Sequence, residues 1–421
     1  MFKSIFKSST FKQSQITIAG TLLNGLLGAL FYILLARFLG PSEFGLLAVS
    51  IATLTLIADV ADLGTNTGLI RFVSSSFVSD KEQAFKYLKL SLEIKIVVWI
   101  IVLVIGWLLS PFIATSIFGK PELINPLRLV MIGVGGALLF TFSTSALQAF
   151  QKYLTWSVIN IATNFLRLIL ILLIFASGQL NLENSLLAGI ALPFFGFSMG
   201  LLFVQFKRII NSKNELSLAG EFFRFNGSIA IFTLIAAVSS RLDTFLNVRL
   251  LTTSEVGIYA AANQLVQIIP QLVGALGIVA APKFASFQNK EQMLVYFKKF
   301  QLMVLGLAGI GVLMIPFATY IIPLLYGDSY VSTVLPFIIL FMAMLIFLIS
   351  IPLHNSIIFY FGKPKVFVWV ALGHLIIIGL LGYFMISNYG VIGAAFTVLV
   401  GTLFNFIAPL LWFLRKIHEK S

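Results

Sequence analysis

Long apolar runs separated by short polar connections dominate the chain. A helix that crosses about 30 Å of hydrocarbon needs roughly 20 apolar residues, and twelve runs of about that length follow one another. Those of the first half are 15–35, 44–70, 96–118, 129–150, 157–177 and 185–206. Those of the second half are 228–247, 256–281, 300–324, 334–359, 366–386 and 391–414. The pattern predicts twelve transmembrane helices in an all-α, polytopic membrane protein.

A short motif occurs twice, each time between two of these runs. Its two copies are Arg37, Leu39, Ser42, Glu43, Gly45 and Arg249, Leu251, Ser254, Glu255, Gly257. Every member is displaced by 212 residues, close to half of the 421-residue chain. Such duplication is typical of repeat-built membrane transporters. We therefore expect two six-helix bundles, 1–206 and 228–421, joined by a cytoplasmic linker, 207–227. Their pseudo-twofold axis would run along the membrane normal.

The composition agrees with this architecture. Hydrophobic residues make up 59% of the chain and charged residues only 10%, whereas soluble domains carry roughly 25% charged residues. With a mean hydropathy of +1.03, the chain cannot cover a water-soluble globule with polar surface. The absence of Cys excludes disulfides, thiolate metal sites and cysteine nucleophiles.

The net charge of +13 predicts orientation. If the N-terminus is inside, most Lys and Arg fall in inner segments, as cytoplasmic loops require. Both termini are then cytoplasmic, in the inner membrane of a prokaryote, and the charge attracts anionic membrane lipid rather than nucleic acid. Two inner segments, 79–95 and 288–299, mix Lys with aromatic residues and predict short amphipathic helices on the membrane surface.

Polar side chains inside the apolar runs are the candidate site. They are Asp59, Asp62 and Asn66; Asn160, Asn164 and Arg167; Arg241, Asp243 and Asn247; Gln264, Gln267 and Gln271; and His354 and His374. The first three fall at i, i+3 and i+7, which places them on one side of a helix. Because a charge facing lipid at mid-membrane costs at least ~2.5 kcal/mol, these groups should face protein or water.

Each set also has a purely structural interpretation. Arg241 and Asp243 can pair with neighbouring helices to hold the bundle together, and the Asn and Gln side chains can join helices in the same way. Asp59 and Asp62 can be buried in protonated or hydrogen-bonded form, or can bind a proton or cation. His354 and His374 can be packed polar residues or proton relays.

Three stretches resemble a known family. They are LLARFLGPSEFGLLAVSIA at Leu34–Ala52, DLGTNTGLIRFVSS at Asp62–Ser75, and RLDTFLNVRLLTTSEVGIYAAANQLVQ at Arg241–Gln267. They are similar to the polysaccharide-exporting branch of the multidrug/oligosaccharidyl-lipid/polysaccharide (MOP) flippase superfamily, which includes the Wzx-type flippases of O-antigen units. The resemblance covers the full length of the chain.

The resemblance implies a V of two six-helix bundles, as in MATE and MurJ transporters, which alternates between inward-open and outward-open states. The implied cargo is a polyprenyl-diphosphate-linked oligosaccharide carried from the inner to the outer leaflet for polysaccharide or O-antigen synthesis. By residue type and depth, Arg167 and Arg241 would bind the diphosphate, with Arg71 and Lys283 on the way in. Guanidinium groups suit phosphate because they bind its oxygens bidentately and stay charged.

Further expectations concern the sugar, the coupling ion and partner proteins. Groups that could contact sugar hydroxyls are Asn160, Asn164, Asn247, Gln264, Gln267 and Gln271. Groups that could couple transport to H⁺ or Na⁺ are Asp59, Asp62 and Asp243. Glycan polymerase or ligase proteins are possible partners. No cofactor, metal or catalytic residue is expected.

Two rivals stay open. A MATE-like, cation-coupled multidrug exporter would use the acidic residues to bind organic cations and the 42 Phe to line an apolar pocket. A non-transporting membrane helper of a glycan synthase would tolerate replacement of Arg167 and Arg241. An enzyme is not expected, because the sequence contains no Gly-rich phosphate loop, His-Glu metal spacing or nucleophile elbow.

Overall fold

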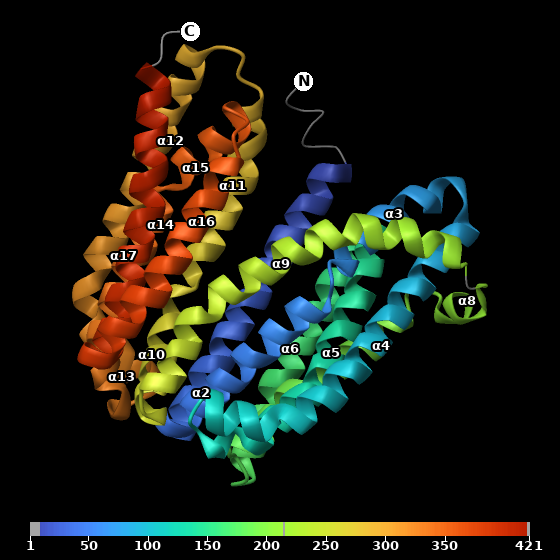
Figure 1. The fold of residues 1–421 in the computed structure, drawn as a ribbon, viewed down its shortest axis with the longest axis horizontal. Coiled ribbons are helices and arrows are strands. Elements are labelled where there is room, and N and C mark those ends of the chain that lie inside the picture. Colours follow the sequence, from blue (N-terminus) through green and yellow to red (C-terminus); the bar gives the residue numbers. More distant parts are fainter. Residues whose placement is uncertain (1–8, 214, 419–421) are drawn as a thin grey trace. The chain divides into compact units, whose positions relative to one another are not determined.

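The structure is a computed structural model that describes residues 9–213 and 215–418 (Figure 1). Every regular element within these ranges is helical, as predicted. Contacts divide the chain into two compact units. The first unit comprises Met1–Leu39 and Leu46–Arg241, and the second comprises Gly40–Gly45 and Leu242–Ser421. The limits expected for the two six-helix bundles and for the linker between them remain predictions.

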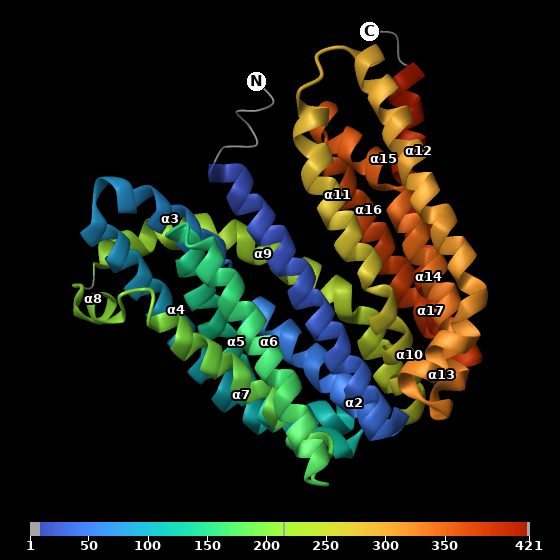
Figure 2. The same cartoon turned by 180° about the vertical axis from the view of Figure 1, so that it is seen from behind.

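The first unit is built around one central helix. Its helices are α2 (Ser9–Ala61), α3 (Thr65–Ser79), α4 (Lys81–Phe112), α5 (Ile124–Ala149), α6 (Tyr153–Ala176), α7 (Leu182–Leu201), α8 (Phe206–Asn211) and most of α9 (Leu216–Leu250). A π-helical turn, Ile113–Ile117, and a 3₁₀ turn, Pro121–Leu123, lead from α4 into α5. Helix α5 packs against both α4 and α7 (Figures 1 and 2) and is the most buried of the apolar helices.

The second unit has α14 at its centre. Its helices are α10 (Thr253–Val266), α11 (Ile268–Ala285), α12 (Lys290–Met314), α13 (Ala318–Tyr326), α14 (Val334–Ile349), α15 (Ile351–Asn355), α16 (Lys365–Ile376) and α17 (Gly382–His418). Short 3₁₀ and π turns occupy Ile315–Phe317, Asp328–Thr333, Ser356–Tyr360 and Ile377–Leu381. Helix α14 packs against α10, α12 and α17.

Ten helical stretches in the described part of the chain are long and apolar enough to cross a membrane, which confirms a multi-pass membrane protein. Two of them, Gly20–Ala61 and Lys365–His418, cover two predicted spans each. Each bends at a glycine with positive φ, Gly40 (φ 74°) and Gly390 (φ 58°), where a residue with a side chain would be strained. Twelve separate spans and the orientation of the termini remain predictions.

The predicted second span, 44–70, is not one helix. Helix α2 ends at Ala61, Leu63 and Gly64 have φ of 52° and 71°, and α3 starts at Thr65. The Asp62 carboxylate accepts hydrogen bonds from the Thr65 hydroxyl (3.1 Å) and the Asn66 N–H (3.3 Å), and so stabilises the new helix start. The prediction that Asp59, Asp62 and Asn66 share one helical face was therefore wrong.

The prediction of two short surface helices at 79–95 and 288–299 was also wrong. Their residues form the first turns of the long helices α4 and α12. Asp80 caps α4 by accepting from the N–H groups of Glu82 (2.9 Å) and Gln83 (3.1 Å), and Asn289 caps α12 in the same way. Nothing breaks either helix after its cap, so the basic segments continue directly into apolar ones.

Within the second unit, residues of the first copy of the repeated motif contact residues of the second copy. A Cβ atom on Gly45 would collide with the backbone carbonyl of Thr253, and one on Gly257 would collide with the carbonyl of Pro41. Pro41 and Thr253 are themselves 212 residues apart, so the contact is reciprocal. The Ser42 and Thr253 hydroxyls are hydrogen-bonded at 2.8 Å. Glycine at both positions lets the two backbones touch.

Candidate functional site

A buried ion pair lies at the break between α2 and α3. The Lys95 ammonium of α4 donates to Asp62 Oδ1, with the Lys95 side chain fully buried and that of Asp62 14% exposed. The sequence pattern placed Lys95 in a cytoplasmic segment and so missed it. Leu88 and Leu92, both buried, precede it at helical spacing, which is the pattern that could have revealed an inward-facing lysine.

Neutral polar groups surround this pair. The Ser145 hydroxyl of α5 donates to Asn66 Oδ1 at 3.2 Å. Asn226 of α9 is 2% exposed, and its amide has no hydrogen-bond partner within the described residues. It lies against Gly64 and Gly68, where any Cβ would overlap it or its neighbours. The first unit therefore has a polar interior where α3, α4, α5 and α9 meet.

Arg167 is held by neutral groups. On α6 its guanidinium donates to Asn164 Oδ1, and the Asn164 amide donates to the Asn24 side chain of α2 and to the Asn160 carbonyl (3.3 Å). The guanidinium carbon lies 4.2 Å from the centre of the Phe31 ring. The predicted grouping of Asn160, Asn164 and Arg167 is thus a continuous network, to which Asn24 is an addition that the sequence did not indicate.

No carboxylate neutralises Arg167 in the part of the chain that the structure describes. Its Nε is buried without a partner, and the ion pairs found there do not include it. Amide and ring contacts orient a guanidinium without cancelling its charge. An anion that reaches it would find unsatisfied donors.

Arg241 of α9 also has a buried Nε without a partner, and the described residues place no carboxylate within ion-pair distance of it. Asp59, near the end of α2, is exposed and lies within electrostatic range of Arg241. The two groups attract each other without direct contact.

In the second unit, Asp243 accepts a hydrogen bond of 2.6 Å from the buried Tyr259 hydroxyl. Asn247, one turn further along α9, is completely buried. His354 contacts the Asn405 carbonyl through Nε2 at 3.1 Å, as a packed polar residue would. This unit thus has its own hydrogen-bonded carboxylate.

Most of the remaining candidates lie at exposed positions. The Arg71 guanidinium is 4.2 Å from the Phe225 ring centre, and the Lys283 ammonium is 5.5 Å from that of Phe287. Gln264, Gln267 and Gln271 straddle the junction of α10 and α11, with the last two exposed. Within the described ranges, no three His, Asp or Glu side chains are grouped to hold a metal ion.

The sequence matches a family profile described as "Polysaccharide biosynthesis protein" over residues 11–288. This match covers more than half of the chain. The chain belongs to the polysaccharide biosynthesis protein family. No curated protein sequence matches it.

Solved structures share the fold of this polysaccharide biosynthesis family member. The lipid II flippase MurJ in an inward closed conformation is 15% identical, with 94% of this chain and 87% of that one covered and a TM-score of 0.72. An inward-facing multidrug resistance MATE transporter of the MOP superfamily is 13% identical, with 94% of each chain covered and a TM-score of 0.73. A variant of the Vibrio cholerae MATE transporter VcmN is 17% identical, with 97% of each chain covered and a TM-score of 0.63. The predicted fold, that of the MOP flippases, is confirmed.

Proposed function

We propose that this protein is a flippase that moves a polyprenyl-diphosphate-linked oligosaccharide from the inner to the outer leaflet of a prokaryotic inner membrane. It would work by alternating access in the synthesis of a surface polysaccharide such as O-antigen. The family match to polysaccharide biosynthesis and the likeness to MurJ, a lipid II flippase, support the cargo class.

The observation that carries the proposal is the Arg167 network. A buried guanidinium without a counter-charge is costly unless an anion binds it for part of the cycle. Because Asn164 and Phe31 fix its plane, it is preorganised for bidentate contact with phosphate oxygens. Arg241 is the second diphosphate ligand in this proposal. Arg71 and Lys283 are further candidates for contact with the diphosphate as the cargo enters.

Neutral amides complete the proposed cargo site. Asn160 and Asn164 lie beside Arg167, and Asn247, Gln264, Gln267 and Gln271 are the remaining candidates for sugar hydroxyls. Amide groups both donate and accept hydrogen bonds, as hydroxyl-rich ligands require.

Ion coupling is proposed at the acidic residues. Asp59 attracts Arg241, so binding of H⁺ or Na⁺ at Asp59 would release Arg241 toward the diphosphate. Asp62 already has Lys95 as its partner, so its role in coupling would act through that pair. Asp243, hydrogen-bonded by Tyr259, is the candidate of the second unit.

Reconstitution into liposomes tests the function. A fluorescent polyprenyl-diphosphate oligosaccharide should become accessible on the far leaflet with the wild-type protein. The Arg167→Gln variant should lose roughly 10- to 100-fold in initial rate, since a hydrogen bond to a charged group contributes about 1.5–3 kcal/mol. Arg167→Lys should retain part of the rate, and Arg224→Gln, an exposed arginine of α9, should retain all of it. Unchanged transport by Arg167→Gln would refute the role of this residue.

Specific observations also favour a second candidate function, that of a drug exporter. The match to a MATE transporter is as good as that to MurJ, and the exposed carboxylate of Asp59 could bind an organic cation. Expression in a drug-sensitive host distinguishes the two, because an exporter confers resistance that Asp59→Asn removes, whereas a flippase restores surface glycan in a flippase-deficient strain. A helper of a glycan synthase would move neither cargo, and Arg167→Gln would leave its activity intact.

A further inference from the structure

A basic cavity lies where α4 begins, at a distance in the sequence from the candidate cargo site. It has a volume of about 400 Å³ and belongs to the first unit. Its lining residues are Lys81, Glu82, Phe85, Lys207, Arg208, Asn211, Ser212 and Lys213. Four of these are cationic and one is anionic. Nothing in the proposed transport mechanism uses them.

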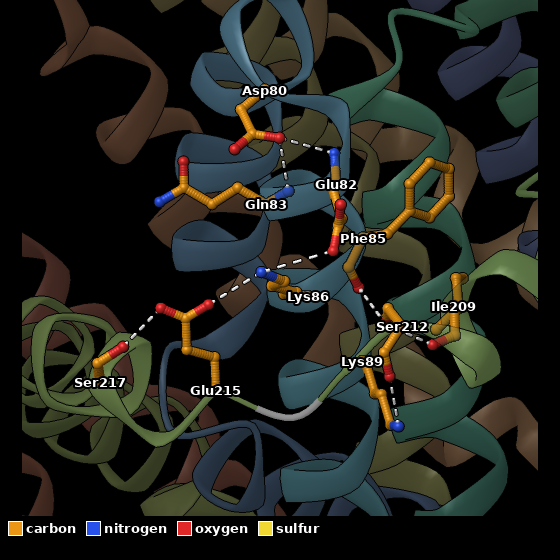
Figure 3. A network of polar contacts seen from close by, with 10 residues as sticks. All are labelled: Asp80, Glu82, Gln83, Phe85, Lys86, Lys89, Ile209, Ser212, Glu215 and Ser217. Atoms are coloured by element: carbon orange, nitrogen blue, oxygen red, sulfur yellow. Dashed lines mark hydrogen bonds and ion pairs between the residues drawn. The ribbon is translucent and has the colours of Figure 1, made fainter.

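Hydrogen bonds hold Ser212, one of the lining residues, against α4 (Figure 3). The Lys89 ammonium donates to the carbonyls of Ser212 (2.7 Å) and Ile210 (3.1 Å). The Ser212 hydroxyl donates to the Ile209 carbonyl at 2.7 Å. The segment after α8 is therefore fastened to α4, and the cationic side chains beside it start from a fixed backbone.

Two of the four cations of the cavity, Arg208 and Lys81, are in contact with neutral groups. The Arg208 guanidinium lies 5.2 Å from the Phe85 ring centre and donates to Gln205 Oε1 at 3.2 Å. The Lys81 ammonium lies 5.6 Å from the ring centre of Phe77. The single lining carboxylate, Glu82, is 3.7 Å from the Lys86 ammonium and is shared with it. The cavity therefore keeps a positive potential suited to phosphate oxygens.

Exposed apolar side chains lie within α8 and in the segment just before it. Leu202, Phe203 and Ile210, next to α8 or within it, are 78%, 43% and 52% exposed. Exposed apolar residues interleaved with Lys and Arg are typical of a segment at the membrane–water interface. The predicted orientation places this end at the cytoplasmic leaflet, where anionic lipids gather.

We propose that this cavity binds the phosphate headgroup of an anionic membrane phospholipid, whose acyl chains lie along Leu202, Phe203 and Ile210. Arg208 and Lys213 are the principal headgroup ligands, with Lys81 and Lys207 beside them. The bound lipid fastens the start of α9 to the membrane surface. The inference does not rest on the proposed cargo.

Lipid binding to the purified full-length protein tests the proposal. Affinity for phosphatidylglycerol would be measured by native mass spectrometry, with phosphatidylcholine as the zwitterionic reference. The Arg208→Gln/Lys213→Gln double variant should lose about 25-fold in phosphatidylglycerol affinity, at roughly fivefold for each charge, and should bind phosphatidylcholine as before. Arg208→Lys/Lys213→Arg keeps both charges and should stay within about threefold of the wild type.

A matched control removes two charges elsewhere. Lys298 and Lys299 of α12 are exposed and line no part of this cavity, so Lys298→Gln/Lys299→Gln should retain the affinity for phosphatidylglycerol. An equal loss in this control would overturn the proposal, because it would indicate attraction by net charge alone. An excess of inorganic phosphate should leave the lipid bound, and complete displacement by phosphate would show instead a site for a soluble anion.

Discussion

Replacing Lys95 by Met isolates the energetic role of the buried ion pair. The substitution keeps a similar volume but leaves the Asp62 carboxylate without its counter-charge. Breaking a buried pair costs about 3–5 kcal/mol. Asp62 keeps its hydrogen bonds from Thr65 (3.1 Å) and Asn66 (3.3 Å), so we expect the lower end, about 3 kcal/mol. For a unit of about 150–250 residues, the range into which the first unit falls, this lowers the apparent Tm by about 6–12 °C.

The double variant Lys95→Met/Asp62→Asn decides whether the loss comes from the unpaired charge. Neutral partners of similar size need no counter-ion, so stability should return to within about 1 kcal/mol of the wild type. Lys86→Gln is the matched control: Lys86 lies on the same helix, but its ion pair with Glu215 is partly exposed to solvent, so the Tm should change only slightly. Thermal unfolding in detergent at one fixed scan rate measures all of these. The reasoning fails if Lys95→Met is as stable as the wild type, or if the double variant is no better than the single one.

Two further predictions concern backbone contact and pH. Gly45→Ala should destabilise the protein by about 1–3 kcal/mol because its Cβ meets backbone, whereas Gly28→Ala in the same helix, with open space around it, should not; equal melting temperatures would contradict this. Hydrogen bonds from Ser217 and then Lys86 lower the pKa of Glu215, so its contribution to stability is present above the ordinary pKa and is lost as pH falls through the lowered one. The small difference in Tm between the wild type and Glu215→Gln should therefore vanish at acid pH, and a difference that grows on acidification would show the opposite sign.

Part of the candidate site was readable from spacing. Asn160, Asn164 and Arg167 recur at helical intervals in an apolar run, and one continuous helix brings them together. Their grouping is local, so periodicity was sufficient to predict it. By contrast, Asn24 reaches Asn164 from a helix 140 residues earlier in the chain, and no local pattern reports such a contact.

The Asp62–Lys95 pair illustrates the other limit. Hydropathy assigned Asp62 to an unbroken span, because an average over apolar residues does not register the turn at Leu63 and Gly64. It assigned Lys95 to a cytoplasmic segment, because it does not show which side of α4 faces inward. The left-handed turn and the helix start beside Asp62 depend on backbone conformation. Only the packing of α4 against the break selected Lys95 as the partner.

The sequence by itself determined that the chain is a helical, multi-pass membrane protein with the MOP fold, because these properties are sums over many residues or follow from local spacing. The tertiary structure decided which charges are paired and which have no counter-charge among the described residues. Two helices brought together by packing fix the distance between their side chains, and electrostatic energy depends on that distance rather than on position in the sequence.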